Sequence, residues 1–240
     1  MRAVVVLGLI AVTLFSGCGG SEEAGEPARE KETSSPVKDE QDAGYIAGRP
    51  IQGECNGKKV TLPASDGDDI IVGTDGKDVV VAGAGDDRIE TFGDRDVICG
   101  ADGDDVLLGG IGPADRMIGG AGDDVLAAGD GDDYLAGGGG DDLLVGEDDS
   151  DTLLGGPGTD RLSGNLGADL ADGGPGDDLV VTDEGNDEVF GGSGSDRISG
   201  GQGDDSVRGD EGADSVFGGS GRDRCDEDDA DRARLECERR

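Results

Sequence analysis

A nine-residue unit repeated eighteen times, from Ala64 to Asp226, sets the strongest limit on what this chain can fold into. The copy at residues 119–127, for example, reads GGAGDDVLA, and the one change of length is an extra residue near Pro113-Ala114. A short period repeated in register is typical of a solenoid, in which each copy contacts only its neighbours. The repeat therefore predicts stacked coils, and no ordinary globular core, over about two thirds of the 240 residues.

Three positions of the unit are almost invariant. Position four is Gly except where Asp94 and Asp149 replace it, and position eight is apolar throughout, with Ala171 and Cys225 as its weakest members. Position six is Asp in all eighteen units, and these are the candidate metal ligands: Asp69, Asp78, Asp87, Asp96, Asp105, Asp115, Asp124, Asp133, Asp142, Asp151, Asp160, Asp169, Asp178, Asp187, Asp196, Asp205, Asp214 and Asp223.

Each of these preferences has a physical cause. Glycines at positions one, two and four allow positive φ angles and a tight turn whose carbonyl groups can face a ligand. Positions seven to nine, such as Val79-Val80-Val81, favour extended backbone, and alternation places position eight on one face. The unit therefore predicts a three-residue strand followed by a six-residue turn, with parallel strands stacked about 4.7–4.9 Å apart.

The repeats carry a large negative charge, with 42 acidic and nine basic residues. A bare ladder of aspartates would repel itself, so a compact state needs a counter-charge. Calcium accepts six to eight oxygen ligands in irregular geometry and suits carboxylates mixed with turn carbonyls better than magnesium does. An EF-hand is excluded, because the glycine density leaves no room for its flanking helices.

In this pattern the chain resembles the RTX family, whose nonapeptide G-G-x-G-x-D-x-U-x binds calcium. The resemblance implies an all-β, right-handed parallel β-roll in which two units make one coil and calcium lies between units n and n+2. Carried onto residues 64–226, this gives nine coils, two facing sheets and two rows of sites. Eight gaps per row allow at most sixteen ions, whose charge of +32 nearly balances the −33 of the repeats.

The two rows differ in sequence when the units are numbered from Ala64 and sorted into an odd and an even row. Asp94, Asp149 and the extra residue near Pro113 all fall in even units, namely units 4, 10 and 6. These units border five of the eight even gaps. We therefore expect the odd row to be complete and the even row to hold about three good sites, with weaker ones beside them.

The segments that precede the repeats indicate export and attachment. Residues 1–17 form a predicted signal peptide, with an apolar run from Ala3 to Phe15 that is too short to span a bilayer. Ser16-Gly17-Cys18 resembles a bacterial lipobox, which implies cleavage before Cys18 and acylation of its thiol. The alternative is an ordinary secretory signal followed by an incidental cysteine. Residues 18–48 then form a disordered acidic linker, and residues 49–63 an N-terminal cap strand.

Four further cysteines flank the roll. A pairing of Cys55 with Cys99 and of Cys225 with Cys237 would attach each cap to the repeats, although other connectivities stay open. Residues 227–240 form the expected C-terminal cap, and the spacing of Ala230, Ala233 and Cys237 predicts a short helix within it.

Composition narrows the function. The absence of His excludes catalysis and zinc sites that depend on it, and the acidic surface excludes nucleic acid. We expect a calcium-binding, lipid-anchored protein, without catalysis, at a bacterial cell surface or outside the cell, whose repeats fold on calcium. Alternatives are an adhesin or spacer of the envelope with a surface protein or polysaccharide partner, and an enzyme acting on polysaccharide through Glu188 with Asp183 and Glu184.

Overall fold

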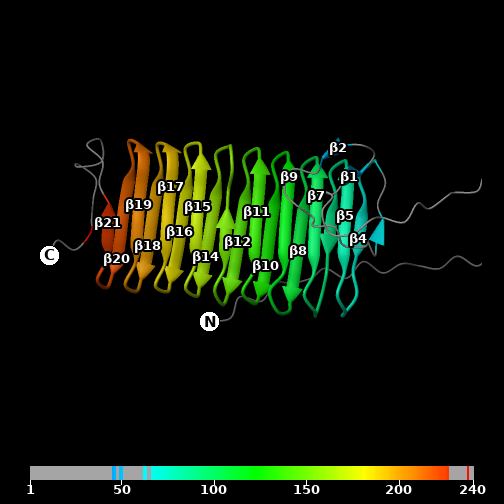
Figure 1. Cartoon of the computed structure of the whole chain (residues 1–240), viewed down its shortest axis with the longest axis horizontal. Coiled ribbons are helices and arrows are strands. Elements are labelled where there is room, and N and C mark those ends of the chain that lie inside the picture. Colours follow the sequence, from blue (N-terminus) through cyan, green and yellow to red (C-terminus); the bar gives the residue numbers. More distant parts are fainter. Residues whose placement is uncertain (1–44, 47–48, 51–61, 64–65, 227–236, 238–240) are drawn as a thin grey trace, which may run out of the picture. The chain divides into compact units, whose positions relative to one another are not determined.

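The repeat region forms two parallel sheets that face each other across a thin core (Figure 1). The computed structural model describes residues 45–46, 49–50, 62–63, 66–226 and 237, all within one of the two compact units of the chain, residues 38–240. The described residues are all β or irregular, and β1 (Tyr45–Ile46) and β2 (Arg49–Pro50) form a separate antiparallel pair.

The odd units supply one sheet and the even units supply the other. The nine-stranded sheet contains, in spatial order, β4 (Ile70–Val72), β6 (Arg88–Glu90), β8 (Val106–Ile111), β10 (Val125–Asp130), β12 (Leu143–Asp148), β14 (Arg161–Leu166), β16 (Leu179–Glu184), β18 (Arg197–Gln202) and β20 (Ser215–Ser220). The ten-stranded sheet contains β3 (Leu62–Pro63), β5 (Val79–Ala84), β7 (Val97–Asp102), β9 (Arg116–Ala121), β11 (Tyr134–Gly139), β13 (Thr152–Leu154), β15 (Leu170–Pro175), β17 (Glu188–Gly194), β19 (Ser206–Gly212) and β21 (Arg224–Asp226).

Each strand pairs in parallel with the strands one coil before and after it. Val125 of β10 lies opposite Val106 of β8 on one side and Leu143 of β12 on the other. Units n and n+2 are therefore neighbours and two units make a coil, so the predicted β-solenoid of about nine coils is confirmed.

The predicted strand length of three residues is wrong for most of the roll. β10, for example, runs for six residues from Val125 to Asp130 and so includes positions one to three of the next unit. Ala128 at position one has no ladder partner, but Gly129 and Asp130 pair again with Gly110 and Ile111. Because successive turns stack in register, the backbone beyond the bend still meets its copy in the neighbouring coil.

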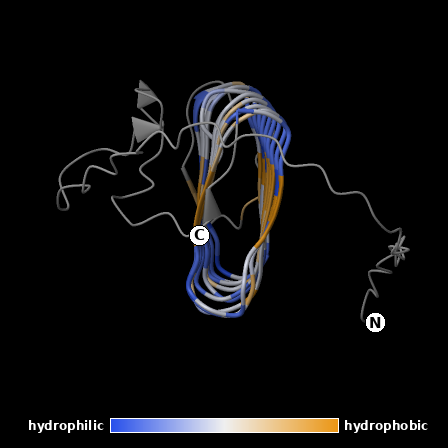
Figure 2. Cartoon of the chain, turned by 90° about the vertical axis from the view of Figure 1, so that its right-hand side faces the viewer, coloured by the Kyte–Doolittle hydropathy of each residue, from blue (hydrophilic) through white to orange (hydrophobic). Residues whose placement is uncertain are grey.

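Position-eight side chains fill the space between the sheets. Val80, Leu107, Leu126 and Leu144 are completely buried, as are most of their equivalents, while Ile71 and Cys225 close the two ends of the cluster. In Figure 2, apolar residues lie along the sheets and polar residues gather at the turns. The prediction that position eight forms the core is confirmed, and the turns are left free for polar chemistry.

Several predictions fall outside the described residues. These are the signal peptide at 1–17, the acylated Cys18, the linker at 18–48 apart from Tyr45–Ile46, and Cys55. The helix expected within residues 227–240 also lies there, apart from Cys237. Of the predicted cap strand, Leu62–Pro63 is described as β3 and pairs in parallel with β5. The described ranges contain no helix long and apolar enough to span a membrane.

Candidate metal centre

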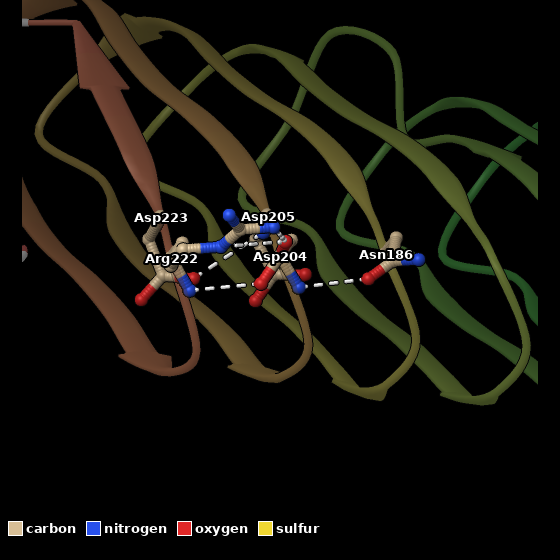
Figure 3. Close-up of polar contacts among 5 residues, drawn as sticks. All are labelled: Asn186, Asp204, Asp205, Arg222 and Asp223. Carbon is tan, nitrogen blue, oxygen red and sulfur yellow. Dashed lines mark hydrogen bonds and ion pairs between the residues drawn. The ribbon is translucent and has the colours of Figure 1, made fainter.

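The eighteen aspartates of position six form one ladder of inner carboxylates along each edge of the roll. The amide of Asp105 donates to Oδ1 of Asp124 at 2.8 Å, and the amide of Asp124 donates to Oδ1 of Asp142 at 2.8 Å. The contact recurs in both rows, and Figure 3 shows its last copy on the even edge, from Asp205 to Asp223. The structure thus brings the predicted ligands into two continuous rows.

The second oxygen of these carboxylates is buried and has no hydrogen-bond partner. A buried, unpaired carboxylate oxygen is costly unless a proton or a cation compensates for the lost water. The oxygen is Oδ2 in Asp87, Asp96, Asp105, Asp124, Asp133, Asp142, Asp151, Asp160, Asp169, Asp178, Asp187, Asp196, Asp205 and Asp223. Because this unpaired oxygen recurs along both edges, it indicates a ligand that can bind at coil after coil.

The position-one glycines show what surrounds these oxygens. A β-carbon added at Gly173 would lie 2.6 Å from Oδ2 of Asp178 and 2.7 Å from the carbonyl oxygen of Gly191. Gly200 has the same surroundings, with Oδ2 of Asp205 at 2.6 Å and the Gly218 carbonyl oxygen at 2.7 Å. The glycine therefore packs tightly against a carboxylate oxygen and a carbonyl oxygen of the next unit in the row, and we call these two atoms the inner oxygen pair.

The donor set fits calcium. Calcium–oxygen distances are about 2.3–2.6 Å, and calcium accepts carboxylate and backbone carbonyl oxygens together. Within the described ranges no three acidic or cysteine side chains converge, so backbone carbonyls would have to complete any site. The position-six aspartates would hold the ion with these carbonyls, and the ion would supply the positive charge that both ladders need.

Burial raises the pKa of the inner carboxylates. The pKa reaches about 8 for Asp124 and Asp151 and about 7 for Asp105 and Asp133, chiefly through desolvation and partly through neighbouring carboxylates. Hydrogen bonds from backbone amides oppose these effects in each case. Part of the ladder would therefore hold protons at neutral pH when no metal is bound, and a cation would displace them.

The turns that depart from the repeat leave the ladder intact. Asp149 takes the left-handed backbone of the glycine that it replaces, with a φ of 78°. In unit 4 the positive φ lies one residue earlier, at Gly93, and not at Asp94. Oδ1 of Asp94 accepts a hydrogen bond from the amide of Arg95 at 3.0 Å. The extra residue near Pro113 is absorbed before Asp115, whose Oδ1 still accepts the amide of Asp96 at 2.7 Å. The expected weakness of the even sites therefore stays a prediction about turn carbonyls.

Position-five side chains form a second, outer ladder, which is far more acidic on the odd edge. Six odd units carry Asp there, whereas the even units have only Asp132 and Asp204, together with Lys77, Arg95 and Arg222. The odd outer ladder is continuous from Asp68 to Asp141, each carboxylate accepting the amide of the next unit at 2.8–3.1 Å.

On the even edge, Asp204 accepts an ion pair from Arg222, and its own amide donates to Asn186 at 2.7 Å (Figure 3). The side chain of Arg222 stands 71% exposed and that of Asp204 46% exposed, so water screens the pair. The last coil of the even row thus carries its own counter-charge on the outside.

Sequence reasoning missed three threonines, all in the even row. Thr74 donates to Oδ2 of Asp78 from its amide at 2.7 Å and from its hydroxyl at 3.1 Å. The hydroxyls of Thr91 and Thr182 donate to carbonyl oxygens one coil further on. For Thr91 and Thr182, the sequence did contain a signal, since both stand at position one, where most units have glycine.

The carboxylates considered for an enzyme lie at the end of β16 and at the start of β17. Asp183 has a left-handed φ of 64°, Glu184 accepts a hydrogen bond from the Gln202 amide at 3.2 Å, and Glu188 begins β17. Glu184 and Gln202 also line a shallow groove across the turns of units 12 to 18. Glu184 is thus held by a neighbouring coil, as expected for a residue at the end of a stacked strand.

Three of the described cysteines are disulfide-bonded. Cys225 and Cys237 form a disulfide with their Cα atoms 6.2 Å apart, and both pack against the end of the core. Cys99 is also disulfide-bonded, and its predicted partner Cys55 lies outside the described residues.

Comparison with known proteins agrees with this geometry. The family described as the RTX calcium-binding nonapeptide repeat (4 copies) matches residues 63–98, 93–113, 118–153, 154–189 and 190–225. No curated protein matches the chain. The matched segments cover more than half of the 240 residues and coincide with the two ladders. The chain therefore belongs to the RTX calcium-binding nonapeptide repeat family.

Proposed function

We propose that the chain is an exported, lipid-anchored surface protein whose repeats bind calcium and fold on it. The observation that carries the proposal is the row of buried Oδ2 atoms without a hydrogen-bond partner on each edge. A chain with 42 acidic and nine basic residues in its repeats gains most from a ligand that neutralises those rows. Metal binding and folding are then a single process.

Far-ultraviolet circular dichroism of the full-length chain in detergent tests the folding step. With a chelator at neutral pH we expect a disordered spectrum, and with millimolar calcium a β-rich one. Magnesium at the same concentration is the control, and it should restore far less structure because it requires tighter octahedral geometry. A spectrum that is unchanged by chelator and calcium would contradict the proposal.

Acylation at Cys18 is a separate part of the proposal, supported by the Ser16-Gly17-Cys18 sequence after an apolar run. The mass of the mature protein, recovered from a bacterial membrane fraction, should show cleavage before Cys18 and added acyl chains. The variant Cys18→Ala should lose both changes. Recovery of the wild type as an unmodified soluble chain would favour an ordinary secretory signal.

A role as an adhesin or spacer is the second candidate, favoured by apolar side chains on the outer face of the nine-stranded sheet. Ile70 is 80% exposed, and Leu143, Leu179 and Phe217 are also exposed. An adhesin would need such a surface in addition to calcium. Binding of calcium-loaded protein to cells or matrix should fall when Leu143 and Leu179 are replaced by Ser, and should not fall when Arg161 between them is replaced.

A further inference from the structure

A second cluster of buried apolar side chains lies on the outer face of the ten-stranded sheet, apart from the position-eight core. Its members stand at positions seven and nine of β5, β7 and β9, and each is at most 5% exposed. We call it the outer cluster, and it consists of Val79, Val81, Val97, Cys99 and Ile118. Because alternation directs these positions away from the core, a buried side chain there needs cover from above the sheet.

Neighbours within a sheet do not supply this cover. Val125 of β10 lies between Val106 and Leu143 on the outer face of the other sheet, yet it is only half-buried. In the ten-stranded sheet itself the burial ends at β11, where Tyr134 and Ala136 are only partly buried. The cover therefore extends over β5, β7 and part of β9.

The cover is one-sided and comes from the chain itself. At the same end of the roll, Ile70 and Val72 on the outer face of β4 are 80% and 59% exposed. The structure contains a single chain, so the atoms that bury the outer cluster belong to it. The strand β3 (Leu62–Pro63) lies beside β5 within the sheet and not over it. The segment of residues 51–61, which leads from β2 into β3, is the nearest candidate along the sequence.

The cysteines favour the same segment. Cys99 in the outer cluster is disulfide-bonded, whereas Cys225 and Cys237 are bonded to each other. Of the five cysteines, only Cys18 and Cys55 are left as partners of Cys99 within the chain. The thiol of Cys18 would carry an acyl chain in the proposed function, so Cys55 is the partner. A disulfide holds two Cα atoms within about 7 Å, which brings residues 51–61 to the outer cluster.

The segment is long enough to make this contact. Cys55 lies seven residues before Leu62 of β3, and β7 lies two strands away from β3. Two strand spacings amount to about 10 Å, whereas seven extended residues span up to about 23 Å. The segment can therefore reach β7 and return to β3, and it contains Ile51 and Val60 as apolar side chains for the contact.

We propose that residues 51–61 dock on the outer cluster, with Cys55 bonded to Cys99, so that the segment lies along the side of the roll instead of over its open end. The contact buries apolar side chains and needs no metal, so it is independent of the proposed calcium binding. The outer face of β5 and β7 is then closed to other partners, whereas the outer face of β4 stays open to them.

Peptide mapping of the unreduced, full-length wild type in detergent with calcium is the first test. We expect a linked pair of peptides that contains Cys55 and Cys99. A link between Cys18 and Cys99, or between Cys99 and a second copy of the chain, would overturn the inference. A chain that folds equally well without calcium would give the same map and would defeat only the proposed function.

Thiol accessibility in the calcium-loaded chain tests the docking itself. Val79→Cys and Val125→Cys place the same thiol at position seven, in the outer cluster and on the half-buried opposite face. Iodoacetamide should modify the first at least tenfold more slowly, with the modified residue identified by peptide mass. Adding Ile51→Asp with Val60→Asp should bring the rate at position 79 close to that at position 125. Equal rates in the two single variants, or no effect of the two aspartates, would contradict the docking.

Discussion

The two edges of the roll share an inner ladder but differ in what surrounds it. On the odd edge the inner carboxylates are backed by a continuous outer ladder from Asp68 to Asp141. On the even edge the outer positions carry Lys77, Arg95 and Arg222, and three threonines donate hydrogen bonds inside the turns. The same fold thus offers one edge that depends on added cations and another that partly supplies its own hydrogen bonds and charges.

The largest difference between the edges should appear when one inner carboxylate is removed from each. Asp124→Asn lies in the odd row, and we expect it to lose one or two bound calcium ions and to raise the calcium concentration needed for folding several-fold. Asp187→Asn lies beside Thr182 in the even row and should lose at most one ion. Calcium titration followed by circular dichroism measures both, and equal losses would argue that the edges are equivalent.

A pH titration tests the property that the edges share. Because burial raises the folded pKa of Asp124 and Asp151 to about 8, above the unfolded value near 4, the folded state holds more protons in between. In chelator, the stability of the roll should therefore rise as the pH falls from about 8 to about 4, and should be lost again as the pH rises.

Circular dichroism in chelator across this range provides the measurement, with β-rich structure expected at the acidic end and lost toward neutral pH. Asp124→Asn on the odd edge and Asp151→Asn on the even edge should each remove a similar part of the pH dependence. A chelator spectrum that does not change with pH would show that the inner carboxylates are not buried in the metal-free chain.

A smaller effect is expected from placing a β-carbon against one inner oxygen pair of the odd row. A β-carbon at Gly119 would contact Oδ2 of Asp124 and lie 2.6 Å from the Gly137 carbonyl oxygen, so Gly119→Ala should weaken one site without unfolding the calcium-loaded roll. Gly139→Ala makes the same chemical change in open space and is its control. Isothermal titration calorimetry should show one weakened site for the first variant only, and equal titrations would contradict a role of the inner oxygen pair in calcium binding.

The smallest effect is expected outside the ladders. Arg222→Ala removes the exposed ion pair with Asp204, and because water screens both side chains, the melting temperature in calcium should hardly change. A large loss of stability in calcium would mean that the outer charges of the even edge matter more than its inner ladder.

Much of this architecture could be predicted because one physical constraint acts at each repeat position. Apolar position eight had to be buried, and Asp124 with its equivalents had to stack, once two units made a coil. The length of the strands could not be predicted, since the pairing of Gly129 with Gly110 depends on how the turns stack and not on residue preference. The hydroxyls of Thr91 and Thr182 were missed for a related reason, because threonine at position one looks like a tolerated variation until its acceptor in the next coil is known.

The eighteen-residue distance between successive members of each ladder makes the edge on which a residue lies a matter of parity. Deletion of one unit of nine residues would move every later side chain to the opposite edge, so Thr182 would move to the edge that carries the acidic outer ladder, while Asp204 and Arg222 would move there together. Deletion of two adjacent units would shorten the roll and keep each edge as it is. Such a chain can therefore change length freely only in steps of a whole coil.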